Sequence, residues 1–326
     1  MRLPLLLVTF VLFPVSLFGS PDTFAVEAEW NTYFQEGLFN EIVYDYHSSV
    51  GEYKLSHLYW EMKNLITAGP AITLKWHRLQ VELSYLFPVT EGRGNMYDYD
   101  WLGKTTGYMV LGVGVSEDEW THYSKSKVAI ERYRQLDTAL IWNFYKNSLI
   151  HINSGFELDY LSIRWEDTPI SYIYSTPTAD GYKANEGTFT ASNAINYDFY
   201  SLSPNYSIQM LLTLPAGFLL RAKAAYSPFS WRETWDEHML NNNGAGTAYN
   251  DIFHFTHQLQ TSLAVEKALC NTYSFGFSGT LFNHFHARGD TEIWSIDKST
   301  LYSETENTSG SNAWYLQIGF SAAYIY

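Results

Sequence analysis

Two short clusters in this sequence carry side chains that could activate a water molecule. Asp98 and Asp100 lie two residues apart, and so do Asp236 and His238. Because side chains alternate along a β-strand, each pair would point to one side of its strand. Asp236 can orient the imidazole of His238 and favour its protonated form. His238 could then act as a general base on a water held by Asp98 or Asp100, which predicts hydrolysis without a covalent intermediate.

The end of the chain has the clearest strand pattern. Every second residue from 314 to 326 is apolar or aromatic, and most residues between them are small or polar. Aromatic residues at both ends of one apolar face are typical of a strand that crosses an outer membrane. Similar alternation occurs in four earlier segments: 79–90, 150–160, 253–266 and 273–285.

The composition favours a membrane β-barrel over a soluble domain. Aromatic residues make up 17% of the chain and charged residues another 17%, whereas soluble domains usually carry about a quarter charged residues. No apolar run after residue 18 is long enough for a transmembrane helix. Strands with one face in lipid and one in water would produce this mixture.

Turn signals alternate between short and long connections. The short ones lie near 77–78, 145–148, 214–217 and 269–271, and the long polar ones span roughly 45–53, 101–119, 167–190, 237–251 and 290–312. We therefore predict an all-β fold, a ten-stranded antiparallel transmembrane β-barrel of the outer-membrane type with long extracellular loops. Each strand would have about twenty residues, roughly twice what a bilayer needs.

The N-terminal residues have the features of a secretory signal peptide. Arg2 precedes an apolar run that ends at Phe18 and is followed by small residues. We expect a signal peptide over 1–20, cleaved between 19 and 25, and a single barrel domain over 24–326. The lone Cys270 excludes an intramolecular disulfide.

The formal charge of −14 bears on possible partners. An acidic lumen and rim would attract cationic peptides or proteins. Nucleic acid is excluded as a partner because phosphates need a basic surface. We expect a monomer in contact with outer-membrane lipid.

Strand parity predicts where the two clusters point. Between Leu79 and Val89 the odd positions face lipid, so the even positions Asp98 and Asp100 should face the lumen. Asp236 and His238 instead share the parity of lipid-facing residues upstream in their segment. A β-bulge would return them to the lumen, and Pro228 is a plausible place for it.

The motifs around these residues resemble those of the omptins, outer-membrane proteases of Gram-negative bacteria. Gly-Asn-Met-Tyr-Asp-Tyr-Asp-Trp over 94–101 matches an omptin segment, and Asp-Glu-His over 236–238 matches a second. Trp120-Thr121 and Ser-Tyr-Ile-Tyr-Ser over 171–175 are also similar. The likeness covers essentially the whole mature chain, in order.

The resemblance implies an outer-membrane endopeptidase, of the aspartic type, that cuts extracellular peptides or proteins. Its site would lie in a groove at the extracellular top of the barrel. An Asp pair, Asp98 and Asp100, and the Asp236–His238 pair would bind the nucleophilic water. Glu41 matches an acid that contacts a basic substrate side chain before the cut, so basic residues near the cut are expected.

The chain departs from the omptin pattern at substrate- and lipid-binding positions. The second acid of the basic-residue pocket falls at Thr234, and a further acidic position falls at His122. The neighbouring Glu233 could substitute for the acid that is missing at Thr234, but its side chain would point to the opposite face of a regular strand. The positions that match the lipopolysaccharide-binding acid and arginine pattern carry neither: Phe156, Leu158 and Tyr160.

Other functions remain open from the sequence. A barrel of this fold could be a non-catalytic adhesin or a small pore, whereas a lipid-modifying barrel enzyme would need a Ser–His pair that is not evident. His284 and His286 could bind a metal on one strand face, but polar lumen positions are favoured because no third ligand is evident. We expect no metal and no cofactor.

Overall fold

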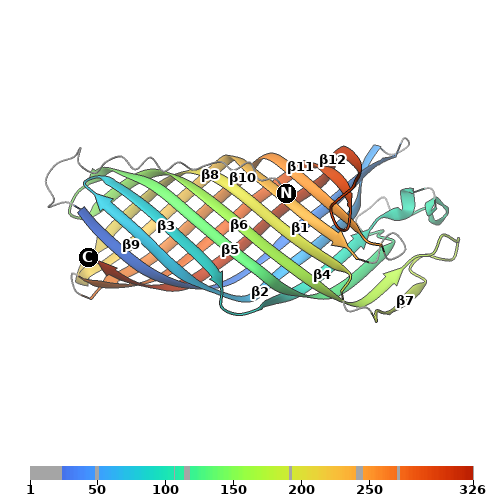
Figure 1. Ribbon diagram of the computed structural model, residues 1–326, viewed down its shortest axis with the longest axis horizontal. Coiled ribbons are helices and arrows are strands. Elements are labelled where there is room, and N and C mark those ends of the chain that lie inside the picture. The colour runs from blue at the N-terminus through green and yellow to red at the C-terminus, as the bar shows by residue number, and fades with distance from the viewer. Residues whose placement is uncertain are drawn as a thin grey trace.

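The computed structural model describes residues 24–47, 51–105, 107–113, 118–190, 193–239, 245–269 and 272–325. The signal peptide expected over 1–20 and Cys270 lie outside these ranges. Figure 1 shows long strands wound around one axis, as the alternating sequence pattern predicts.

Strands make up almost all of the described chain. The strands are β1 (Phe24–His47), β2 (Gly51–Trp76), β3 (Leu79–Pro88), β4 (Gly92–Asp100), β5 (His122–Lys146), β6 (Ile150–Tyr174), β7 (Asn185–Thr188), β8 (Ile195–Leu214), β9 (Phe218–His238), β10 (Thr247–Ala268), β11 (Tyr273–Ser295) and β12 (Leu301–Ile325). The helices are the single 3₁₀ turns η3 (Leu102–Lys104), η4 (Met109–Leu111) and η5 (Pro215–Gly217). No helix in the described ranges is long and apolar enough to cross a membrane.

The sheet closes on itself as a ring of ten antiparallel strands. β12 pairs with β1, which removes both free edges of the sheet. β3 and β4 occupy one position in the ring, because both pair with β2 on one side and with β5 on the other. β7 pairs only with β6 and extends beyond the ring. The predicted all-β, ten-stranded barrel is confirmed.

The strands are longer, and several loops shorter, than the sequence indicated. β11 and β12 continue to Ser295 and from Leu301, so most of the loop expected over 290–312 is paired strand. The loops expected over 167–190 and 237–251 also lose residues, to β6 and to β10. The polar residues in these stretches are typical of loops in sequence. In the structure they lie on strands, and both faces of these strands are outside the lipid.

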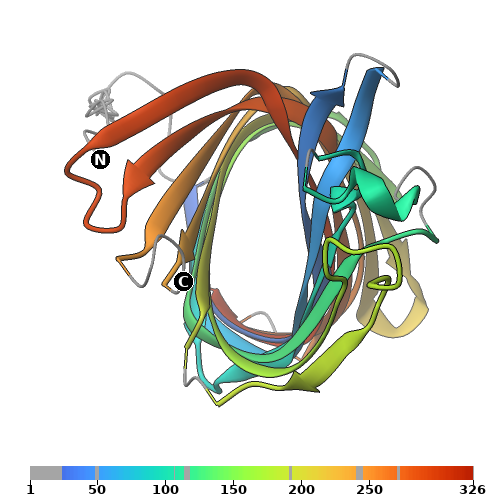
Figure 2. The same ribbon diagram turned by 90° about the vertical axis from the view of Figure 1, so that its right-hand side faces the viewer.

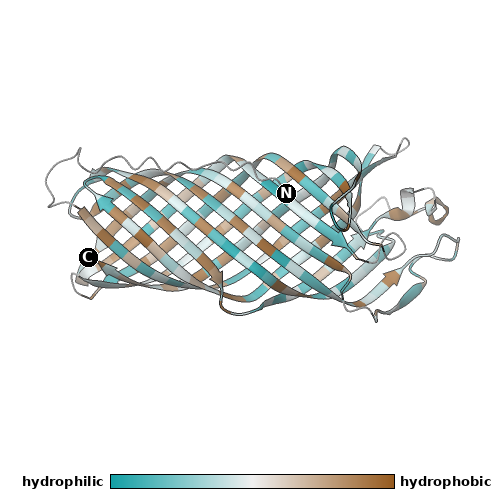
Figure 3. Ribbon diagram, viewed as in Figure 1, coloured by the Kyte–Doolittle hydropathy of each residue, from teal (hydrophilic) through white to brown (hydrophobic). Residues whose placement is uncertain are grey.

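Exposed apolar side chains form a band around one half of the barrel. Figure 3 shows more brown residues, interleaved with white and teal ones, in the half where short turns join the strands, which we call the turn end. The other end, with the long connections and β7, is the loop end. The exposed residues of β12 confirm the predicted alternation: Trp314, Leu316, Ile318, Phe320 and Tyr324. Such a band is the part of a barrel that lies in lipid.

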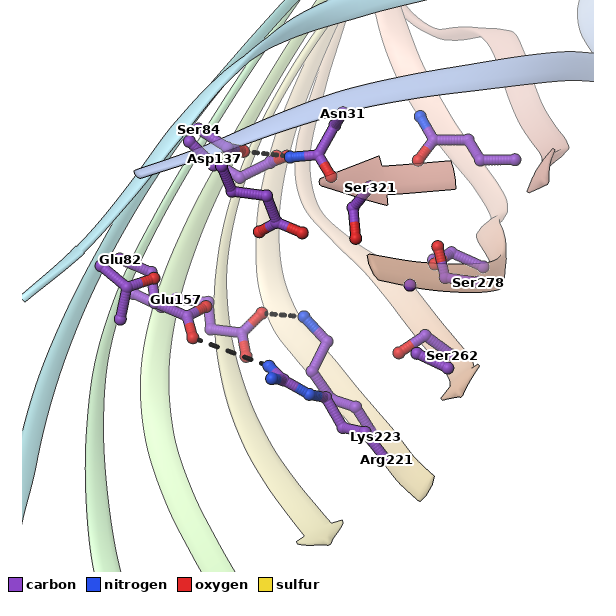
Figure 4. A pocket seen from close by; sticks show the side chains of 18 of the residues that line it. Asn31, Glu82, Ser84, Asp137, Glu157, Arg221, Lys223, Ser262, Ser278 and Ser321 are labelled. Atoms are coloured by element: carbon purple, nitrogen blue, oxygen red, sulfur yellow. Dashed lines mark hydrogen bonds and ion pairs between the residues drawn. The ribbon is translucent and has the colours of Figure 1, made fainter. Parts of the chain in front are cut away.

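The lumen inside this band is polar. A cavity of about 220 Å³ is lined by charged and polar side chains from most strands of the ring. Figure 4 shows Arg221 and Lys223 projecting into it toward acidic residues of the opposite wall. Lys223 Nζ lies 2.7 Å from Glu157 Oε2, and Arg221 Nη2 lies 3.0 Å from Glu266 Oε1. Ion pairing compensates for the burial of these charges.

An aromatic layer fills the lumen above this cavity. Phe39 is completely buried, and its ring centroid lies 4.9 Å from those of both Trp165 and Phe199. Trp60 stacks on Tyr197 with centroids 4.9 Å apart. Close-packed rings of this kind exclude water and form an apolar floor for whatever lies between them and the loop end.

β-bulges near mid-height reverse which residues face the lumen. In β9, Ser230 pairs with Thr256 and Ser227 with Gln258, so β9 holds one extra residue between them. β10 has its own extra residue near Phe255, whose φ is 55°. The alternation predicted over 253–266 therefore does not hold at its start, since Phe253 is fully buried whereas Phe255 is 75% exposed. Sequence alternation by itself does not reveal where such an extra residue occurs.

We expect replacement of Phe39 by alanine to destabilise the barrel. The substitution leaves a cavity among the rings of Trp165, Phe199 and Tyr315, which costs about 3–5 kcal/mol in the free energy of unfolding. Denaturant titration of the protein in detergent, followed by tryptophan fluorescence, would measure it. Phe156→Ala is the control, because this ring is 69% exposed on the outer wall and its loss leaves no internal cavity. Equal effects of both changes would contradict a packed layer.

Candidate active site

The first cluster lies on β4, directly above the aromatic layer. Met96 is buried in that layer, and Asp98 and Asp100 follow it on the same face of the strand. The predicted lumen parity of both aspartates therefore holds in the structure. Ser56 of the neighbouring β2 donates a hydrogen bond of 3.2 Å from its Oγ to Asp98 Oδ1.

The second cluster lies at the end of β9 and faces the lumen because of the bulge. Arg221 and Lys223 line the lumen below it, whereas Arg232 and Asp236 are buried above it, so lumen parity changes from odd to even. The change falls between Ser227 and Ser230, where the register shifts. The sequence-based hypothesis of a bulge at Pro228 is confirmed.

His238 and Asp236 form a hydrogen-bonded pair. The imidazole Nε2 lies 2.5 Å from Asp236 Oδ2, and the ring packs edge-on against Tyr249 with centroids 5.3 Å apart. On the outer face of the same strand tip, Glu237 pairs with Arg164 at 2.9 Å and with Lys298 at 2.8 Å. These ion pairs anchor the strand end that presents Asp236 and His238.

The two clusters face one another across the mouth of the barrel. β5, β6 and β8 separate β4 from β9 on one side of the ring, and five strands separate them on the other. Figure 2 looks into this oval mouth, with β4 and β9 in opposite walls. Asp236 lies seven residues beyond the exposed Phe229, which is roughly 20 Å of strand. The site is therefore outside the apolar band.

Mutual charge effects indicate how near the clusters are. Burial lowers the pKa of His238, but the charge and hydrogen bond of Asp236 and the charges of Asp98 and Asp100 outweigh it and raise the pKa to about 9. The imidazole is therefore protonated at neutral pH in the substrate-free protein. The two clusters therefore lie close enough for their charges to interact across the lumen.

The Asp pair is arranged to hold a shared proton. Burial, together with the charge of Asp100, raises the pKa of Asp98 well above its usual range. Burial also raises the pKa of Asp100 to about 6, although a hydrogen bond from Ser56 and the charge of His238 oppose the change. Two such carboxyls titrate as a pair, and one of them can accept a hydrogen bond from water while the other stays protonated.

Glu41 and Thr234, the expected substrate-binding positions, lie beside Asp236. Glu41 is buried on β1, two residues beyond Phe39, and Thr234 is buried on β9, two residues before Asp236. Burial and the charge of Asp236 raise the pKa of Glu41 well above its usual range. Glu233 accepts a hydrogen bond from Trp235 Nε1 at 2.6 Å on the opposite face, so it does not contribute to this pocket, as predicted.

His122, the third expected substrate-binding residue, pairs with Asp100 across β4 and β5. Its ring packs on Tyr174 at a centroid distance of 4.8 Å and lies edge-on to Tyr108 at 5.2 Å. Burial lowers the pKa of His122. The wall next to the Asp pair is thus aromatic and uncharged at neutral pH.

Asp251 is a further acid near Asp236 and Glu41, and the sequence did not indicate it. It pairs with Thr234 in register and is 3% exposed at the lumen face of β10. The sequence predicts a loop over 237–251, whereas β10 begins at Thr247. Tyr249 and Phe253 lie on the same side of a strand as Asp251, because all three occupy alternate positions. This spacing could have indicated a strand.

The described residues contain no group of three His, Cys, Asp or Glu side chains arranged to hold a metal ion. The two histidines considered as a metal pair are on different faces of β11. His284 is buried in the lumen, whereas His286 is exposed and lies near the hydroxyl of Tyr44, and a register shift separates them. The interpretation of both as lumen positions is therefore wrong for His286.

Comparison with known proteins assigns the barrel to a family. The family model of the omptin family matches residues 26–325. The crystal structure of the outer membrane protease OmpT from Escherichia coli superposes with a TM-score of 0.82 at 16% identity, covering 95% of this chain and 99% of that one. A FadL homologue of Pseudomonas aeruginosa and the toluene transporter TodX of Pseudomonas putida reach TM-scores of only 0.29 and 0.31, each at 8% identity over 93% of this chain and 90% of theirs.

No curated protein sequence matches the chain. The family match nevertheless spans nearly the whole described barrel, and the barrel superposes on that of an outer-membrane protease. The chain therefore belongs to the omptin family, the aspartic-type proteases of the bacterial outer membrane.

Proposed function

We propose that this protein is an endopeptidase that hydrolyses extracellular peptides or proteins with a water activated between Asp98–Asp100 and Asp236–His238. The observation that carries the proposal is the convergence of an imidazole–carboxylate pair and a carboxyl pair over one lumen opening. The loop end would face the outside of the cell, with the groove open to large substrates. No metal or cofactor takes part in the proposed reaction.

The proposed reaction needs one water and two proton movements. The water oxygen attacks the peptide carbonyl carbon while its proton passes to His238, and Asp98 or Asp100 orients the water. Collapse of the tetrahedral intermediate breaks the C–N bond, and the imidazolium returns the proton to the leaving amine. Asp236 stabilises the imidazolium throughout. The products are a carboxylic acid and an amine.

A basic substrate residue would assist this step. Bound near Glu41 and Asp236, its positive charge would offset the carboxylate charge that raises the pKa of His238. The imidazole would then lose its proton more easily and become available as the base. This supports a preference for cationic substrates. The aromatic layer below the groove argues against a small pore, since it fills the lumen at mid-height.

Replacement of Asp98 or of His238 by alanine should lower kcat/KM by about 10²–10⁴-fold, because each change removes a group that orients or deprotonates the water. A mixed peptide library, analysed by mass spectrometry, would provide substrates for the refolded mature protein. Assays with and without lipopolysaccharide would show whether the enzyme needs this lipid.

The matched controls are Asp297→Ala in the exposed loop before β12 and His151→Ala at the turn end. Both should retain activity. Cleavage that survives Asp98→Ala and His238→Ala would refute the assigned residues. A well-folded barrel that cuts no peptide would instead favour a non-catalytic adhesin.

The pH profile should show two ionisations. As pH rises through about 6, Asp100 loses its proton, and as it rises toward about 9, His238 becomes neutral in the free enzyme. For an uncharged peptide, kcat/KM should therefore rise in two steps. Asp236→Asn should move the upper step to lower pH, because it removes the main charge that raises the pKa of His238. An unshifted upper step would contradict this pairing.

Deletion of Phe229 should abolish activity while leaving a folded barrel. Removal of the extra β9 residue would turn Asp236 and His238 to the outer face and Glu237 to the lumen. Peptide cleavage and heat-modified mobility on gels would report on activity and folding. Phe229→Ala keeps the residue count and should stay active. Full activity of the deletion variant would show that the bulge does not set the site.

A further inference from the structure

Asp251 lies where it can take part in binding a substrate side chain. It faces Thr234 across the β9–β10 pairing, and these residues are 3% and 1% exposed at the lumen face. Its Oδ1 accepts a hydrogen bond of 2.6 Å from Thr291 Oγ1 of β11, which orients the carboxyl. An acid is thus present at the height of Thr234, but one strand further around the ring.

Glu41 and Asp251 act on each other across this part of the lumen. The charges that affect Glu41 most strongly are those of Asp236, Asp251 and Asp98, and all are negative. Burial raises the pKa of Asp251 to about 7, and the charge of Asp236 adds to the rise against the hydrogen bond from Thr291. No positively charged side chain is among the main charges that act on Glu41 or on Asp251.

Glu41 also has an unused hydrogen-bond acceptor. The residue is 2% exposed, and its Oε2 has no hydrogen-bond partner among the described residues. Buried carboxyl oxygens are normally paired, because an unpaired one costs the free energy of its lost hydration. The neighbouring Asp236 is itself a carboxyl, so Glu41 and Asp236 can share a hydrogen bond only while one of them holds a proton, and a cationic donor from a substrate could take the place of that proton.

Arg232, two residues before Thr234 on β9, does not serve as that donor. Its guanidinium donates to the backbone oxygens of Ser311, at 2.7 Å, and Phe285, at 3.3 Å. It lies between the rings of Phe199 and Phe253, 5.7 and 5.8 Å from their centroids. Arg232 therefore belongs to the floor beneath the acids.

We propose that Glu41 and Asp251 together bind the guanidinium or ammonium group of the substrate residue next to the cut bond. Two buried carboxyls from different strands suit the forked donors of arginine, which can pair with both at once. Asp236 lies beside the same pocket, so the bound residue would be adjacent to the activated water. The proposal rests on the proposed protease function and assigns specificity to an acid on β10.

The test uses two quenched fluorescent peptides that differ only before the cut, one with arginine and one with its uncharged analogue citrulline. The wild type should prefer the arginine peptide. Asp251→Asn should reduce this preference in kcat/KM by about 30-fold, with the citrulline peptide cut at nearly the wild-type rate. Thr234→Asp added to Asp251→Asn should restore the preference. Glu233→Gln, on the outer face beside Thr234, is the matched control and should change neither rate.

An unchanged preference in Asp251→Asn would overturn the proposal, and so would an equal loss on both peptides without rescue by Thr234→Asp. Binding of the two peptides, measured by fluorescence anisotropy, separates this outcome from failure of the protease function. If the wild type cuts neither peptide but binds arginine over citrulline in an Asp251-dependent way, the pocket stands and the catalytic assignment fails. Equal binding of both peptides would refute the pocket.

Discussion

The alternation of side chains along a strand is the constraint on which this protein depends. In a closed barrel every residue must face either the lumen or the outside, and one extra residue reverses the choice for the rest of its strand. Near mid-height β9 and β10 each contain such a residue. Below it, apolar residues cover the wall in the membrane, and above it the same reversal turns Asp236 and Asp251 inward.

The second requirement is a floor that keeps water away from the lower side of the site. Phe39, Trp60, Trp165, Tyr197 and Phe199 form it, and Glu41 and Asp98 each follow a member of the buried cluster by two residues. Burial against this floor raises the pKa values of the acids. It also makes their mutual repulsion strong, because a low dielectric screens charges poorly. A cationic substrate side chain relieves that repulsion, which connects the packing of the barrel to its proposed specificity.

Much of this organisation was predictable from local pattern. The alternation in β12 and the short turns indicated ten strands, and parity counted from Leu79 placed Asp98 and Asp100 correctly. Parity failed for Phe253 and His286, and in both cases a bulge intervenes. Loop lengths were overestimated because strands outside the lipid carry polar residues on both faces. A hydrophobicity pattern does not distinguish such strands from loops.

The sequence by itself determined the barrel, its strand number, and the residue types that converge at the mouth, because alternation and motif spacing are local properties of the chain. Tertiary structure decided which acids share a pocket. Thr234 and Asp251 are separated by a loop in sequence, and only the pairing of β9 with β10 makes them neighbours. It also brought Asp98 and Asp100 of the opposite wall near His238, where their charges add to the larger effect of Asp236 on the pKa of the imidazole. Distances across a lumen depend on how the ring closes, and no segment of sequence contains that information.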